Sequence, residues 1–64
     1  MYILKGAYVN MQIKFKTGNA AFEEHGYWQE IDRILRSISD KVRLGYDHGS
    51  IMDINGNKIG EWSL

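Results

Sequence analysis

The chain has 64 residues, which is enough for one small domain and too few for two. Hydrophobic residues make up 44% and charged residues 25% of it, and Pro and Cys are absent. This composition excludes disordered, collagen-like and disulfide-stapled chains. Eight Lys and Arg balance eight Asp and Glu, so no overall charge would collect nucleic acid or anionic lipid. Without a membrane-length apolar run or a secretory signal, we expect a cytoplasmic protein.

Residues 1–10 have two interpretations. The segment MYILKGAYVN contains strand-forming residues interrupted at Gly6, so one interpretation is an extra strand. The other is an N-terminal extension, because Met11 is a second candidate start and Lys5-Gly6-Ala7 is what a translated ribosome-binding sequence would encode. Under both interpretations, residues 11–64 form the single domain.

A strand and a short helix are predicted next. Residues 11–16 alternate strictly between apolar and polar side chains, which predicts a half-buried strand. Its inner face comprises Met11, Ile13 and Phe15. Asn19 is a good N-cap for a helical turn at residues 20–24, which Gly26 then ends.

The longest predicted element is an amphipathic helix at residues 27–44, ended by Gly45. Its apolar stripe comprises Trp28, Ile31, Leu35, Ile38 and Val42, with Tyr27 and Ile34 on one flank. Its outer face comprises Glu30 with Arg33, and Asp32, Arg36 and Asp40 at intervals of four. Such surface pairs contribute only a few tenths of a kcal/mol each.

A β-hairpin is predicted at residues 51–64. The turn is either type I over residues 53–56 with a left-handed Gly56, or type I′ centred on Asn55 and Gly56. The two choices shift the register by one residue and exchange the faces of Ile51 and Met52. The rest of its apolar face comprises Ile54, Ile59 and Trp62. We therefore expect an α+β fold, with one long amphipathic helix packed on a small antiparallel sheet: β-α-β-β, or β-β-α-β-β if residues 1–10 form a strand.

No catalytic, cofactor or metal site is predicted, and we expect a protein that is not an enzyme. Asp53, Asn55 and Asn57 imitate the start of a calcium loop, but Lys58 and Leu64 stand where that loop needs Gly and Glu. Two histidines, His25 and His48, flank the long helix, and Asp47 next to His48 would make a general-base pair. No serine has the setting of an activated nucleophile.

Two kinds of binding surface are considered. The two Trp and four Tyr supply more large amphipathic side-chain surface than so small a core can enclose. The surplus favours contact with another protein. The predicted contact residues are Tyr27, Arg33, Arg36, Tyr46 and Trp62. The alternative is nucleic-acid binding through Lys14, Lys16, Arg36, Lys41 and Arg43, although strand lysines and helix arginines should lie on opposite sides of a two-layer domain.

From Met11 onward the chain resembles a family of very small bacteriophage and mobile-element proteins that has no assigned activity. The resemblance rests on MQIKFKTGNAAFEE, IDRILRSISDKVRLG and IMDINGNKIGEW, and it spans about 54 of the 64 residues. The first ten residues depart from the family pattern, in agreement with a start at Met11. The family implies a setting in which small phage proteins bind and block a host protein.

Together, these features predict a phage or prophage accessory protein that acts by protein–protein binding. The resemblance implies a partner in the bacterial host, such as a defence component of CRISPR type. Because so small a domain has no disulfide to stabilise its fold, we also expect a homodimer. The alternatives are a small nucleic-acid-associated regulator and a self-assembling structural component.

Overall fold

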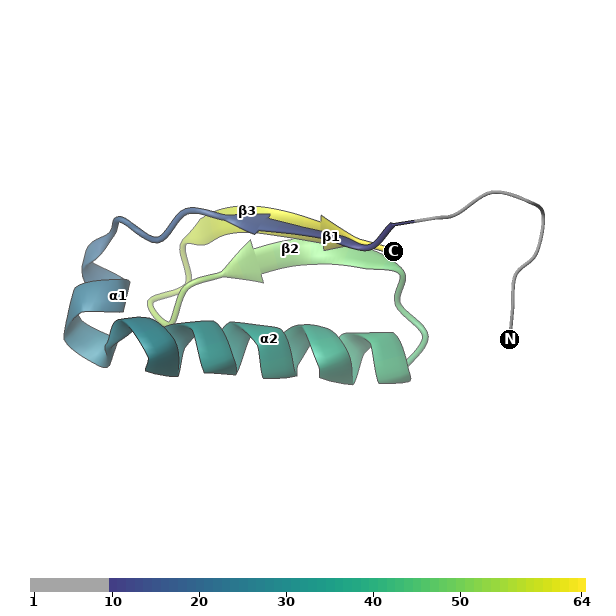
Figure 1. The fold of residues 1–64 in the computed structure, drawn as a ribbon, viewed down its shortest axis with the longest axis horizontal. Helices are drawn as coiled ribbons and strands as arrows, with labels where there is room; N and C mark the ends of the chain where they lie inside the picture. Colours follow the sequence, from purple (N-terminus) through teal and green to yellow (C-terminus); the bar gives the residue numbers. More distant parts are fainter. Residues whose placement is uncertain (1–9) are drawn as a thin grey trace.

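The structure, a computed structural model, describes residues 10–64. Its elements are β1 (Gln12–Phe15), α1 (Ala20–His25), α2 (Tyr27–Arg43), β2 (His48–Met52) and β3 (Lys58–Ser63). The strands form one antiparallel sheet in the order β1-β3-β2, and α2 runs along one face of it (Figure 1). This confirms the predicted α+β fold, with the β-α-β-β order over the described residues. Apart from Asn10, the predicted extension or extra strand at residues 1–10 lies outside them.

The core lies between α2 and the central strand β3. Its buried cluster comprises Phe22, Ile34, Ile38, Ile51, Ile59 and Trp62. Trp62 is only 3% exposed, and its indole lies across Gly49 of β2, where a Cβ would stand 2.8 Å from the indole nitrogen. Burying each of the larger side chains contributes roughly 1.5–3 kcal/mol. The predicted inward positions of Ile59 and Trp62 are confirmed.

The inner face of α2 differs from the predicted stripe. Ile38 of the predicted stripe and Ile34 of its flank are buried, but Trp28 is 71% exposed and Leu35 is also exposed. Glu30, predicted on the outer face, is fully buried. The helix is therefore rotated towards the Ile34 side of the predicted stripe, because the hairpin turn draws the Glu30 carboxylate inward through a hydrogen bond from Ile54 N–H.

The hairpin has the first of the two predicted turns. Asp53 N–H donates to the Asn57 carbonyl oxygen at 2.8 Å, and Gly56 has a φ of 87°, a left-handed conformation that favours Gly. This register buries Ile51 and exposes Met52. The prediction that Ile54 belongs to the apolar face is wrong, because Ile54 lies in the turn and is exposed.

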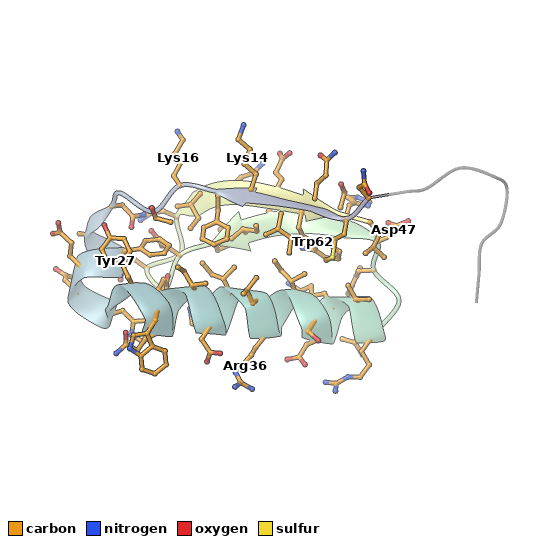
Figure 2. The ribbon with its side chains drawn as sticks, viewed as in Figure 1. Lys14, Lys16, Tyr27, Arg36, Asp47 and Trp62 are labelled. Carbon is orange, nitrogen blue, oxygen red and sulfur yellow. The ribbon has the colours of Figure 1, made fainter. Side chains whose placement is uncertain are left out.

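The other face of the sheet is uncovered and polar. Cross-strand partners place Gln12, Ser63 and His48 in one row, and Lys14, Glu61 and Ser50 in the next. Lys14 and Lys16 point away from the helix and Arg36 points away from the sheet (Figure 2). Within residues 10–64, no helix has the length and apolar character needed to cross a membrane.

Candidate functional site

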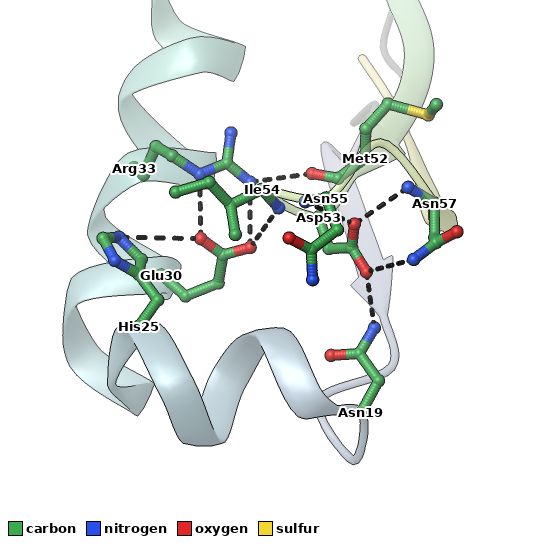
Figure 3. Close-up of polar contacts among 9 residues, drawn as sticks. All are labelled: Asn19, His25, Glu30, Arg33, Met52, Asp53, Ile54, Asn55 and Asn57. Carbon is green, nitrogen blue, oxygen red and sulfur yellow. Dashed lines mark hydrogen bonds and ion pairs between the residues drawn. The ribbon is translucent and has the colours of Figure 1, made fainter.

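A buried carboxylate joins the hairpin turn to the start of α2 (Figure 3). Glu30 accepts hydrogen bonds from Arg33 Nε at 2.8 Å, from an Arg33 terminal nitrogen at 3.0 Å and from Ile54 N–H at 2.9 Å. Arg33 also donates to the Met52 carbonyl oxygen at 2.8 Å. The Arg33 hydrogen bonds hold the pKa of Glu30 below its ordinary value, although burial acts in the opposite direction. His25 Nε2 lies 3.8 Å from the same carboxylate.

A second buried carboxylate organises the turn itself. Asp53 Oδ1 accepts the backbone N–H groups of Asn57 at 2.8 Å and Asn55 at 2.9 Å. Its Oδ2 accepts the side-chain amides of Asn19 at 2.7 Å and Asn57 at 3.2 Å. The N–H of Asn57 is the leading cause of the lowered pKa of Asp53. Asn19 stands at the N-cap of α1 as predicted, but its side chain binds Asp53 instead of capping the helix.

These two carboxylates have a structural role: they hold the hairpin turn in its conformation. Their oxygens are occupied by donors of the chain itself, so neither presents a base to an open cleft. Asp53 has no further carboxylate or imidazole partner for a cation, and no cluster of three such groups occurs among residues 10–64. The calcium-like spacing of Asp53, Asn55 and Asn57 therefore serves the turn.

The predicted general-base pair is present as a contact. Asp47 Oδ1 lies 2.8 Å from His48 Nδ1, on the uncovered face of the sheet, where Ser63 is the cross-strand partner of His48. Both side chains are about four-fifths exposed, at 78% and 81%. Water therefore surrounds the pair, which lacks the dry, preorganised surroundings that make such a dyad reactive.

The predicted protein-contact residues do not share one surface. Trp62 is in the core, and its predicted role as a contact residue is wrong, because its indole fills the space over Gly49. Arg33 is held by Glu30 and the hairpin. Tyr27 is half exposed with its ring 5.8 Å from that of Phe22, whereas Tyr46 follows the opposite end of α2.

The predicted nucleic-acid residues are also spread over several faces. Lys14 and Lys16 lie on the sheet and Arg36 on the far side of the helix (Figure 2). Lys41 lines the hollow between α2 and β2, and Arg43 lines the groove between α2 and β1. Asp32 and Asp40 neutralise Arg36 and Arg43 at 3.0 and 2.7 Å. These cations therefore form no continuous basic stripe over residues 10–64.

The structure reveals an exposed row of side chains on α2 that we did not predict from the sequence. The Trp28 row consists of Trp28, Asp32 and Arg36, which are spaced four residues apart and lie along one solvent-facing ridge. Arg36 donates to Asp32 at 3.0 and 3.1 Å, and its side chain is 78% exposed. Ile34 and Ile38, one turn apart, are both buried, so the inner face of α2 lies away from Trp28.

The two edges of the sheet differ in chemistry. Beside β1, an apolar groove is lined by Met11, Ile13, Leu35, Ile38, Val42 and Leu64. Beside β2, the corresponding hollow is lined by Arg33, Ser37 and Lys41 of α2 together with Met52 and the buried Ile34, Ile38, Ile51 and Trp62. The β1 groove also contains Arg43, but its Met11, Ile13 and Leu35 are exposed, so more apolar surface is open to solvent beside β1 than beside β2.

Comparisons with known proteins gave no match to a family model, a curated protein or a solved structure.

Proposed function

We propose that this protein is a non-enzymatic binding domain that acts by contacting another protein through the Trp28 row. The observation that carries the proposal is the 71% exposure of Trp28 on a rigid 17-residue helix. A Trp that is 71% exposed contributes little to its own fold, whereas Trp and Arg are among the residues that most often dominate binding energy at interfaces.

The composition of the row suits a protein partner better than a nucleic acid. Trp28 supplies apolar area, and Arg36 supplies a planar donor whose charge is offset by Asp32 at 3.0 Å. A nucleic-acid surface needs several uncompensated cations along one face. The described cations are divided between the sheet, the helix and its two flanks.

The resemblance to small phage proteins supplies the setting of the proposal. In that setting the partner is a protein of the bacterial host. We propose that it is a component of a defence system, such as one of CRISPR type. Binding that blocks this component requires only a folded surface, in keeping with a domain whose buried carboxylates are devoted to holding its turn.

The experiment is affinity capture from host lysate with the full chain, with and without nuclease. Trp28→Ala is the test variant, and Leu44→Ala is the matched control because Leu44 is 75% exposed at the other end of α2. Loss of an anchor of this kind weakens binding by roughly 30-fold or more. The fold of both variants is checked by circular dichroism.

We expect one near-stoichiometric protein that survives nuclease, is retained by Leu44→Ala and is lost by Trp28→Ala. Recovery that disappears with nuclease would favour a nucleic-acid regulator instead. Equal recovery by both variants would show that the Trp28 row is not the contact surface.

A further inference from the structure

Within residues 10–64, β1 pairs with β3 on one side only, so its backbone groups on the other side have no strand partner there. Lys16 N–H donates to the Ile59 carbonyl oxygen at 2.9 Å, so Lys16 faces β3. Because backbone groups alternate sides along a strand, the N–H and C=O of Met11, Ile13 and Phe15 point away from β3. A further strand can therefore bond to β1 at these odd-numbered residues.

The side chains of the same segment form a pattern that is symmetric about Ile13. Residues 10–16, NMQIKFK, have apolar side chains at 11, 13 and 15 and polar side chains at 10, 12, 14 and 16. In an antiparallel pair centred on Ile13, each apolar side chain meets an apolar one on the helix side of the sheet. Each polar side chain meets a polar one on the uncovered side.

Charge disfavours the registers centred closer to Lys16. Centred on Ile13, the pairing places Lys14 opposite Gln12 and Lys16 opposite Asn10 of the other chain. Centred on Lys14, it would place Lys14 opposite itself, and centred on Phe15 it would place Lys14 opposite Lys16. Directly opposed like charges are destabilising, so the lysines exclude both alternatives.

We propose that a second copy of this chain covers the β1 edge, with the two β1 strands paired antiparallel about Ile13. The dimer has a continuous six-stranded sheet, and its two-fold axis puts both α2 helices on one face with their apolar grooves turned towards each other. Leu35 and Val42, which line the groove, then lose contact with water. The pairing is isologous, so it closes at two copies and does not extend into a fibre.

This inference goes beyond the proposed function and is tested separately. Trp28 is not among the residues that line the groove; it lies on the same side of α2 as Leu35, two helical turns closer to the start of the helix. Analytical ultracentrifugation of the full chain measures the dimer dissociation constant, and affinity capture measures partner binding. Trp28→Ala is expected to abolish capture while the dimer persists.

Exposed substitutions at Gln12 give the sharpest test, because Gln12 lies on the polar face and its change leaves the core intact. Gln12→Glu creates two Glu–Lys14 pairs per dimer and is expected to tighten it about 2- to 30-fold, an effect that salt removes. Gln12→Lys is expected to weaken it by a similar factor. Leu35→Arg charges the groove and is expected to give monomers, with Leu44→Arg as the control that stays dimeric.

We expect a wild-type mass of twice the chain, opposite effects of the two Gln12 variants, and dissociation by Leu35→Arg alone. A wild-type chain that stays monomeric at millimolar concentration would overturn the inference. A dimer that responds equally to Leu35→Arg and Leu44→Arg, or that ignores both Gln12 variants, would equally overturn it.

Discussion

Replacing Arg33 by Met should reverse the pH dependence of stability. In the native protein Arg33 lowers the pKa of the buried Glu30, so the pair stabilises the fold above the ordinary Glu pKa of 4.5. That stabilisation is lost as pH falls through the lowered pKa. Without Arg33, burial is the largest remaining influence on the pKa of Glu30 and opposes the hydrogen bond from Ile54 and the charge of His25, so we expect the pKa to rise above its unfolded value. The variant is then most stable at low pH and loses stability as pH rises.

The size of the effect follows from the contacts. Breaking a fully buried ion pair costs about 3–5 kcal/mol; because Arg33 is 35% exposed, we expect the lower end of this range, and the lost hydrogen bond to the Met52 carbonyl adds about 1 kcal/mol. A domain of this length has a total unfolding free energy of only about 3–10 kcal/mol. Arg33→Met should therefore be close to unfolded at neutral pH.

The assay is urea denaturation followed by circular dichroism between pH 4 and 8. Arg36→Met is the matched control, because its partner Asp32 is exposed and the pair is worth about 0–1 kcal/mol. Adding Glu30→Gln to Arg33→Met should recover stability by removing the unpaired charge. If Arg33→Met costs no more than Arg36→Met, or if its stability rises with pH as in the wild type, the Glu30 argument is refuted.

Three further substitutions test the packing. Gly60→Ala should weaken the β1–β3 pairing, because a Cβ there collides with the Lys14 carbonyl oxygen, whereas Gly18→Ala meets nothing within 4 Å; a thermal melt separates the two. Trp62→Ala should cost about 3–5 kcal/mol in urea denaturation, and an effect below 1 kcal/mol would contradict its central place in the core. Because the pKa of Asp53 is lowered, its carboxylate stabilises the fold above the ordinary Asp pKa of 3.8, and this stabilisation is lost as pH falls through the lowered pKa. Asp53→Asn should therefore lose less stability than the wild type as pH falls below 3.8.

Much of the fold could be predicted because its patterns are local. Strict alternation at residues 11–16 and a 3.6-residue period at residues 27–44 indicate a strand and a helix whatever surrounds them. The rotation of α2 could not be predicted, since it depends on a hydrogen bond between Glu30 and Ile54, which are 24 residues apart. The turn type likewise depends on Asp53 accepting donors from both Asn57 and the distant Asn19.

The candidate surface was harder to predict than the fold. Aromatic content suggested a binding face, but counting aromatics does not tell which of Trp28 and Trp62 is buried. Trp62 shares the helix-facing side of the sheet with its cross-strand partners Ile13 and Gly49, and it is covered on both sides because β3 is the central strand. Trp28 is exposed because the inner face of α2 is centred on Ile34 and Ile38. Both outcomes depend on tertiary contacts between residues that are far apart in the sequence.

Site-specific photo-crosslinking in the host tests the central claim most directly. A benzophenone amino acid replaces Trp28 in one full-length variant and Leu44 in another, about 160° round α2 and about 24 Å along it. We predict that position 28 gives one protein adduct that survives nuclease and that position 44 does not. An adduct with nucleic acid, no adduct at position 28, or equal adducts at both positions would contradict the claim that the Trp28 row binds a protein.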